Sequence, residues 1–145
     1  MGTTIVVGVD GSEDADRALA YAIQEARRRD DPTIVAIHSF HLLTYSVGME
    51  FGYSVPQPPE KLEAEAMDRL LRALDRAPKD VPIDPVVVPD SPSHALIEAG
   101  RDADLLVIGS RGHGGFRGLL LGSTSLQVVT HAPCPVVVVP PPDRS

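Results

Sequence analysis

The stretch Thr3-Thr-Ile-Val-Val-Gly-Val-Asp-Gly-Ser12, close to the N-terminus, decides the fold class of this chain. Its first seven residues are β-branched or apolar apart from one glycine, which is typical of a strand buried on both faces of a parallel sheet. Asp10-Gly11-Ser12 interrupts the apolar run, and alanine and leucine then recur at helical spacing from Glu13 to about Arg29. Ile34 to Ile37 forms the next apolar run. The chain therefore begins with a β-α-β unit.

The same alternation of strand and helix continues along the rest of the chain. Apolar periodicity predicts helices from Pro59 to Ala77, from Pro92 to about Gly100 and from Ser123 to about His131. Apolar runs predict strands at Val86 to Val88, Ala103 to Gly109 and Cys134 to Val139. The side chains predicted to face the core include Leu62, Leu70, Leu71 and Leu74 on the first of these helices and Leu126 and Val129 on the last. Such alternation indicates an α/β fold with a doubly wound parallel sheet.

Length and composition limit the number of domains and the classes of partner that the chain can have. Its 145 residues predict a single domain, over residues 1–140, with a frayed tail at residues 141–145. Lys and Arg number 13 against 20 Asp and Glu, a net charge of -7, so we expect no binding of nucleic acid or of anionic lipid. The single cysteine, Cys134, excludes an intrachain disulfide, and no apolar run is long enough to span a bilayer. We expect a cytoplasmic protein without a membrane segment.

A long connection follows the second predicted strand. The segment from His41 to Pro58 has no clear periodicity and is longer than a compact domain normally uses between two elements. It contains three of the six aromatic residues, Tyr45, Phe51 and Tyr53, with Phe40 immediately before it. Two interpretations stay open, a loop that packs over a flat ligand and a loop that folds on its own side chains.

Two glycine-bearing breaks follow predicted strands. One is Asp10-Gly11-Ser12, and the other begins at Gly109 and runs to Gly122-Ser123-Thr124 at the start of a helix. Ligands of doubly wound sheets bind beyond the carboxyl ends of the strands, so neighbouring strands would place both breaks in one crevice. The free N–H groups of a helix N-terminus favour a phosphate there. The Walker lysine and the dinucleotide-binding spacing are both missing, which excludes an ordinary P-loop NTPase or dehydrogenase.

The glycine spacing Gly109-x2-Gly112-x9-Gly122-Ser123 resembles that of the universal stress protein family. The resemblance extends over nearly the whole chain, through VVGVDGS (6–12), DLLVIGSRGHGG (104–115), LLLGSTS (119–125) and PCPVVVV (133–139). It implies a Rossmann-like, five-stranded parallel sheet in the order 3-2-1-4-5, with helices on both faces. Because members that bind ATP carry this spacing, the intact motif resembles the ATP-binding branch.

The resemblance also implies positions for a bound ATP, accompanied by Mg²⁺. It puts Gly8 and Val9 beside the adenine, Asp10 on the ribose or base edge, and the backbone of Ser39 against the adenine. The ribose would meet Gly109. The residues implied around the phosphates are Gly112, His113, Gly122, Ser123 and Thr124, with Arg111 as a charged candidate. Arg117 is more simply interpreted as a solvated loop arginine.

Other reactive residues have simpler interpretations. Asp10 could serve only as the N-cap of the first helix, although the glycine loop favours ligand contact. His38 and His41 would point to opposite faces of a strand, so we expect no metal site. Cys134 lies between two prolines at the start of a buried strand, which favours packing over redox chemistry.

The function expected from these features is that of an ATP-binding stress-response protein that acts as a nucleotide-dependent sensor or interaction module. The loop supplies neither a lysine nor a carboxylate for phosphoryl transfer, so we expect no enzyme activity beyond slow ATP hydrolysis. The alternatives are a slow ATPase and a partner-binding scaffold that prefers another adenine nucleotide, such as cyclic AMP.

A homodimer is also expected, through Val136, Val137, Val138 and Val139. In the implied strand order these valines form an edge strand without charge or internal proline, which invites pairing with a second copy. The alternative is that Pro140-Pro141-Pro142 folds back over this edge.

Overall fold

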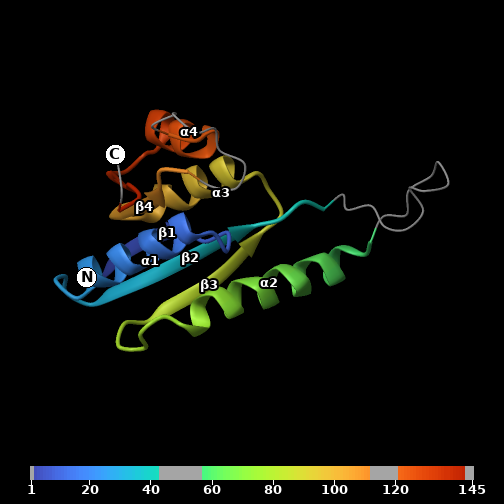
Figure 1. Ribbon diagram of the computed structural model, residues 1–145, viewed down its shortest axis with the longest axis horizontal. Helices are drawn as coiled ribbons and strands as arrows, with labels where there is room; N and C mark the ends of the chain where they lie inside the picture. Colours follow the sequence, from blue (N-terminus) through green and yellow to red (C-terminus); the bar gives the residue numbers. More distant parts are fainter. Residues whose placement is uncertain (1, 43–56, 112–120, 143–145) are drawn as a thin grey trace.

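The computed structural model describes residues 2–42, 57–111 and 121–142, and its strands form one parallel sheet (Figure 1). The strands are β1 (Thr3–Gly8), β2 (Pro32–Ser39), β3 (Ile83–Val88), β4 (Leu105–Gly109) and β5 (Val136–Val139). Their order is β3-β2-β1-β4-β5, and every pairing is parallel. This confirms the doubly wound α/β class and the order 3-2-1-4-5.

Helices cover both faces of the sheet. They are α1 (Glu13–Ala26), α2 (Pro59–Asp75), α3 (Pro92–Ala99) and α4 (Ser123–His131), and a short 3₁₀ helix (Gly100–Asp102) follows α3. Side chains of α1 and α2 pack on Ile5, Val7 and Val107, while those of α3 and α4 pack on the alternate residues Val6, Leu106 and Ile108. Because successive strand residues point to opposite faces, one continuous apolar strand serves two cores.

Two strands are longer than the sequence predicted. Strand β3 begins at Ile83 and not at Val86, so it includes Asp84 and Pro85. These two residues broke the apolar run, yet an edge strand can hold a proline because one side of its backbone has no neighbouring strand. Strand β2 begins at Pro32 and ends at Ser39, which extends it beyond its apolar centre in both directions.

The other differences are contractions at element ends. Helix α1 ends at Ala26, three residues before the expected Arg29, and α2 ends at Asp75, two before Ala77. Strands β4 and β5 each begin two residues later than expected. Helix and strand ends are set by hydrogen bonding, to which apolar periodicity is insensitive.

Three leucine and valine side chains predicted to face the core are exposed, so that part of the prediction was wrong. Leu71 is 49% exposed on α2, and Leu126 and Val129 are 55% and 45% exposed on α4. On α4 the buried residues are Ser125 and Val128. The helix is turned by one residue relative to the prediction because the hydroxyl of Ser125 donates a hydrogen bond to the carbonyl of Gly109 (2.7 Å). In this short helix the hydrogen bond of Ser125, and not the spacing of apolar residues, determines which side faces the core.

The structure supports a packing role for Cys134. Its side chain is half-buried, and burial raises the pKa of its thiol, with a smaller contribution from Asp104. A Cβ on Gly100 would lie 3.3 Å from its Sγ, so the thiol fills space next to the 3₁₀ helix.

A helix that crosses a bilayer needs about 20 predominantly apolar residues. No helix within the described ranges is both long and apolar enough to cross a membrane.

Candidate functional site

The register of the sheet brings the ends of β2, β1 and β4 to one edge. Gly8 pairs with Ile37 on β2, so Asp10 follows at the level of Ser39. Val7 pairs with Val107 on β4, which sets Gly109 at the level of Val9. Because β1 and β4 are neighbours, both glycine-bearing breaks begin side by side at the carboxyl edge of the sheet. Asp10, Ser39 and Gly109 therefore line one carboxyl edge, where ligands of such sheets bind.

Asp10 shapes the turn into α1. Its Oδ1 accepts hydrogen bonds from the backbone N–H of Ser12 (2.9 Å) and from the Ser12 hydroxyl (2.5 Å). Gly11 between them has φ 84°, in the left-handed region that glycine adopts without strain. The N-cap of α1 is Ser12, whose hydroxyl accepts from the N–H of Ala15, so the alternative that made Asp10 the cap was wrong.

Gly8 and Val9 are held tightly by their neighbours. A Cβ on Gly8 would lie 3.1 Å from the end of the Leu96 side chain on α3, which would have to shift by a few tenths of an ångström. The N–H of Val9 donates to the carbonyl of Ile37 (2.8 Å), and its carbonyl accepts from Nδ1 of His38 (2.9 Å). Both backbone groups of Val9 are thus occupied, and its side chain is buried among the residues under α1 and α2.

His38 is a structural residue that the sequence did not reveal. Because a carbonyl can only accept, its Nδ1 carries the proton in the bond to Val9. Its Nε2 is buried and has no hydrogen-bond partner among the described residues. The described part of the chain holds no group of three histidine, cysteine or acidic residues that could bind a metal ion. In the sequence, only the position of His38 at the end of an apolar strand hinted at this role.

Gly109 is enclosed from the side of α1. A Cβ at this position would lie 2.9 Å from both Cβ and the carbonyl oxygen of Asp14, a distance that real side chains do not tolerate. The next residue, Ser110, is buried; its N–H donates to the carbonyl of Val139 (3.2 Å) and its carbonyl accepts from the N–H of Gly122 (2.7 Å). The end of β4 therefore contacts α1, β5 and the start of α4 at once.

The start of α4 lies where the sequence predicted a phosphate site. Gly122 is the N-cap and makes no side-chain capping bond, and the first intrahelical bond runs from the N–H of Leu126 to its carbonyl (2.9 Å). The N–H groups of Ser123, Thr124 and Ser125 precede that bond and have no acceptor within the helix. Ser123 is exposed and Thr124 partly so. The N–H of Gly122 is already used by Ser110, so an anion at this helix end would meet the amides of the first helical turn.

Arg111 is the last described residue before the rest of the glycine loop. Its backbone N–H donates to Oδ2 of Asp14 (3.0 Å), which ties the loop entrance to α1. Asp14 also pairs with Arg17 on the same helix. The predicted residues Gly112 and His113 lie outside the described residues, as do most of the residues from 41 to 58. Sequence reasoning missed the contact of Asp14 because the two partners lie 97 residues apart.

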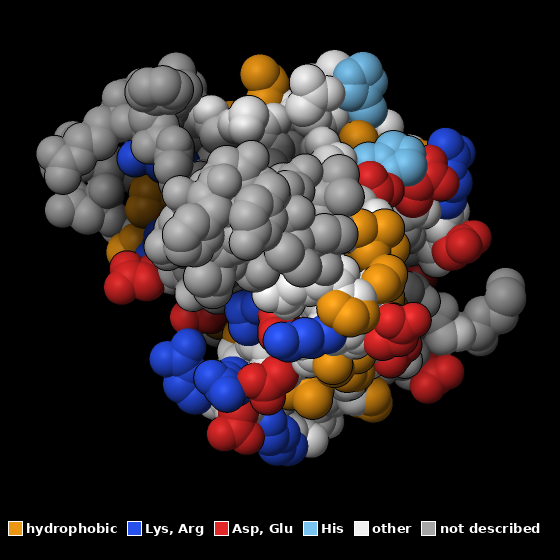
Figure 2. Space-filling view, turned by 90° about the vertical axis from the view of Figure 1, so that its right-hand side faces the viewer, with side chains coloured by type: hydrophobic (Ala, Val, Ile, Leu, Met, Phe, Trp, Pro, Cys, Tyr) orange, Lys and Arg blue, Asp and Glu red, His pale blue; other side chains and the backbone are white. Residues whose placement is uncertain are grey.

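A second charged cluster lies at the same edge, where β3 leads into α3. Asp90 precedes this helix, and its carboxylate accepts from the N–H of Ser91 (2.7 Å) and pairs with Nδ1 of His94. The hydrogen bond that His94 donates to Asp90 raises the pKa of His94, and the same bond lowers the pKa of Asp90. On the face drawn in Figure 2, acidic and basic side chains are interspersed with hydrophobic ones. That face presents no broad region of one charge sign among the described residues.

These features define a class: a doubly wound α/β protein with a helix N-terminus and polar strand ends gathered where the winding reverses. The family model "Universal stress protein family" matches residues 1–140, and the chain belongs to that family.

Individual relatives agree with the assignment. The chain is 37% identical over 134 residues to Universal stress protein Rv2005c of Mycobacterium tuberculosis, covering 92% of this chain but 44% of that protein. It therefore spans less than half the length of this relative. A Thermus aquaticus universal stress protein is 36% identical over 145 residues, covering 96% and 99% of the two chains. Among solved structures, a universal stress protein in complex with cAMP is 30% identical with a TM-score of 0.57, covering 94% and 95%.

Proposed function

We propose that this chain binds an adenine nucleotide, ATP with Mg²⁺, across the carboxyl ends of β1 and β4. The observation that carries the proposal is the meeting of the β4 end with the start of α4, where Ser110 accepts from Gly122 and the first-turn amides of α4 have no acceptor within the helix. Those amides and the helix dipole stabilise a phosphate. The structure in complex with cAMP, 30% identical, supports an adenine nucleotide as the ligand class.

The arrangement suggests a place for each part of the nucleotide. Ser39, Asp10 and Gly109 occupy neighbouring strand ends and are proposed to hold the base and ribose. Ser123 and Thr124 are proposed to hold the phosphates through backbone and hydroxyl groups. Mg²⁺ would neutralise phosphate charge, which this acidic chain otherwise opposes.

Within this proposal the chain works as a nucleotide-dependent sensor or interaction module in the cytoplasm and not as an enzyme. Steady-state turnover with ATP and Mg²⁺ tests the slow-ATPase alternative. A second candidate, a scaffold that prefers cyclic AMP, is favoured by the ligand of the 30%-identical structure.

Calorimetric titration with ATP·Mg, AMP and cyclic AMP tests the proposal directly. We expect ATP to bind with a Kd in the micromolar to tens of micromolar range, about -7 to -8 kcal/mol. Tighter binding of cyclic AMP would favour the second candidate, and no heat with any of the three would refute nucleotide binding.

The Gly122→Val variant tests the position proposed for the phosphates. Gly122 has φ -73°, which any residue adopts, so the branched side chain is expected to block the phosphates while leaving the fold intact. Normal ATP binding by this variant would show that the phosphate position is wrong.

We also propose a homodimer through β5. Hydrogen bonds from Leu106 to Pro135 and from Ser110 to Val139 place the odd-numbered residues of this segment toward β4. In a parallel ladder the alternate N–H and C=O groups, at Val136 and Val138, then point to the open edge. Exposed Leu126 and Val129 on α4, which contacts β5, add apolar surface next to that edge.

A further inference from the structure

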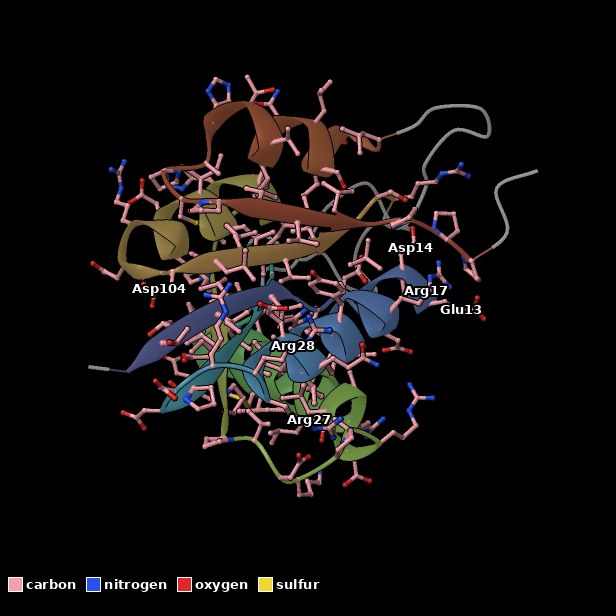
Figure 3. All side chains as sticks on the ribbon, turned by 90° about the vertical axis from the view of Figure 1, so that its left-hand side faces the viewer. Glu13, Asp14, Arg17, Arg27, Arg28 and Asp104 are labelled. Atoms are coloured by element: carbon pink, nitrogen blue, oxygen red, sulfur yellow. The ribbon has the colours of Figure 1, made fainter. Side chains whose placement is uncertain are left out.

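The junction cluster, which we define as Asp14, Arg17 and Arg111, lies where α1 meets the end of β4. Asp14 is in the first turn of α1, and its carboxylate accepts from the backbone N–H of Arg111 (3.0 Å) and pairs with the guanidinium of Arg17. The side chains of Asp14 and Arg17 are 14% and 29% exposed. Figure 3 shows Asp14 and Arg17 together at the start of α1, close to the strand ends, with Arg27 and Arg28 further along the chain.

The cluster has more cationic donors than acceptors. It holds two guanidinium groups and one carboxylate, while Glu13, in the same helical turn as that carboxylate, adds a further one beside the cluster. The Nε of both Arg17 and Arg111 is buried without a hydrogen-bond partner among the described residues. Buried donors in folded proteins are almost always satisfied. The nearby carboxylate of Asp16 pairs instead with Arg76, which follows the end of α2 (3.5 Å).

The surroundings point to the missing acceptor. Arg111 follows Ser110, whose carbonyl accepts from Gly122 at the start of α4, so Arg111 is adjacent in the chain to the residue that bonds the proposed phosphate position. A guanidinium presents a planar fork of donors that matches phosphate oxygens, and it keeps its charge at any physiological pH. The base and the ribose can accept single hydrogen bonds, but only the phosphates also carry the negative charge that two guanidinium groups favour.

We propose that Arg17 joins Arg111, the charged candidate that the sequence indicated, in a subsite for the phosphate groups of the bound nucleotide. Asp14 would hold the guanidinium of Arg17 and the backbone N–H of Arg111 in place. The inference rests on the proposed nucleotide site and deepens it. With this subsite the chain would bind adenosine nucleotides more tightly than adenosine itself. Arg17, on the face of the sheet opposite to α4, becomes a specificity-determining residue.

The test is a calorimetric comparison of adenosine, AMP and ATP·Mg on the wild-type chain and on Arg17→Gln. Arg17→Gln is expected to weaken ATP by about tenfold or more, the effect of losing a charge-assisted hydrogen bond, while adenosine binding is unchanged. A loss shared by AMP assigns the subsite to the first phosphate, and a loss confined to ATP assigns it to the outer phosphates. Arg28→Gln, at an exposed position just after the same helix, is the matched control and should bind all three ligands normally.

Three outcomes separate the inference from its alternatives. Unchanged ATP affinity in Arg17→Gln excludes the subsite, and an equal loss for adenosine shows a purely structural role of Arg17. A wild-type chain that binds neither adenosine nor any nucleotide refutes the proposed function as well, which distinguishes the two failures. If Arg17→Gln does not fold, Arg17→Lys carries the test: it retains the charge without the fork, and a several-fold loss for ATP alone is expected.

Discussion

At the scale of single residues, two glycines of the site are required for different physical reasons. Gly11 has φ 84°, and a Cβ at this position would meet nothing within 4 Å, so its requirement is conformational. Gly109 is required sterically, because a Cβ would lie 2.9 Å from the backbone and side chain of Asp14. A glycine in the sequence does not reveal which of the two reasons applies.

Substitutions at Gly109 and Gly11 distinguish the steric requirement from the conformational one. Gly109→Ala must push α1 away from β4 and is expected to lower the free energy of unfolding by about 1–3 kcal/mol. Gly11→Asn is expected to cost less than about 1 kcal/mol, because asparagine tolerates the left-handed region. Urea denaturation of both variants measures the difference, and equal losses would contradict the steric role assigned to Gly109.

At the scale of elements, the orientation of α4 is set by one hydroxyl. Val128 is fully buried while Leu126 is 55% exposed, although both are apolar and both fit a helical period. Val128→Ala is therefore expected to destabilise the fold by about 2 kcal/mol through the cavity it leaves. Leu126→Ala should change the free energy of unfolding by less than about 0.5 kcal/mol in the monomer. If Leu126→Ala destabilised the fold more than Val128→Ala in thermal or urea unfolding, the helix orientation predicted from periodicity would be correct instead.

The start of α3 provides a pH-dependent contribution to stability. The raised pKa of His94 means that its pairing is fully present below the ordinary histidine pKa and is lost as pH rises through the raised value. The lowered pKa of Asp90 means that its contribution is present above the ordinary aspartate pKa and is lost as pH falls through the lowered value. The pair should therefore stabilise the fold most between about pH 4 and 6.5.

NMR titration of the His94 ring checks this directly. Asp90→Asn is expected to return the pKa of His94 toward its ordinary value, because the charge and the strong acceptor are both removed. An unchanged titration curve in Asp90→Asn would show that the pairing with Asp90 does not determine the shift.

At the scale of the whole molecule, the two sheet edges differ. On β3 the edge carries the charge of Asp84 and the proline of Pro85, which discourage pairing with another chain. On β5 the edge consists of four valines whose side chains pack on the two cores. A charge introduced by Val137→Lys or Val138→Lys would therefore damage those cores as well as an interface.

The backbone offers a cleaner test of the proposed dimer. Val138→Pro removes the N–H that points to the open edge, and Val138→Ala makes a similar loss of side-chain packing while keeping that N–H. We expect the wild-type chain and Val138→Ala to sediment as dimers and Val138→Pro as a monomer. A wild-type chain that sediments as a monomer of 15.5 kDa at micromolar concentration would refute the dimer.

The sequence by itself determined the fold class, the strand order through the family resemblance, and the carboxyl edge where Asp10, Ser39 and Gly109 meet. These features depend on local apolar patterns and on glycine punctuation, which a linear sequence displays. Only the tertiary structure decided the rotation of α4, the hydrogen bond of His38 to Val9 and the junction of Asp14 with Arg111. Each of these depends on a hydrogen bond between residues that are distant in the chain. The sequence around either partner shows no periodic pattern that would predict such a bond.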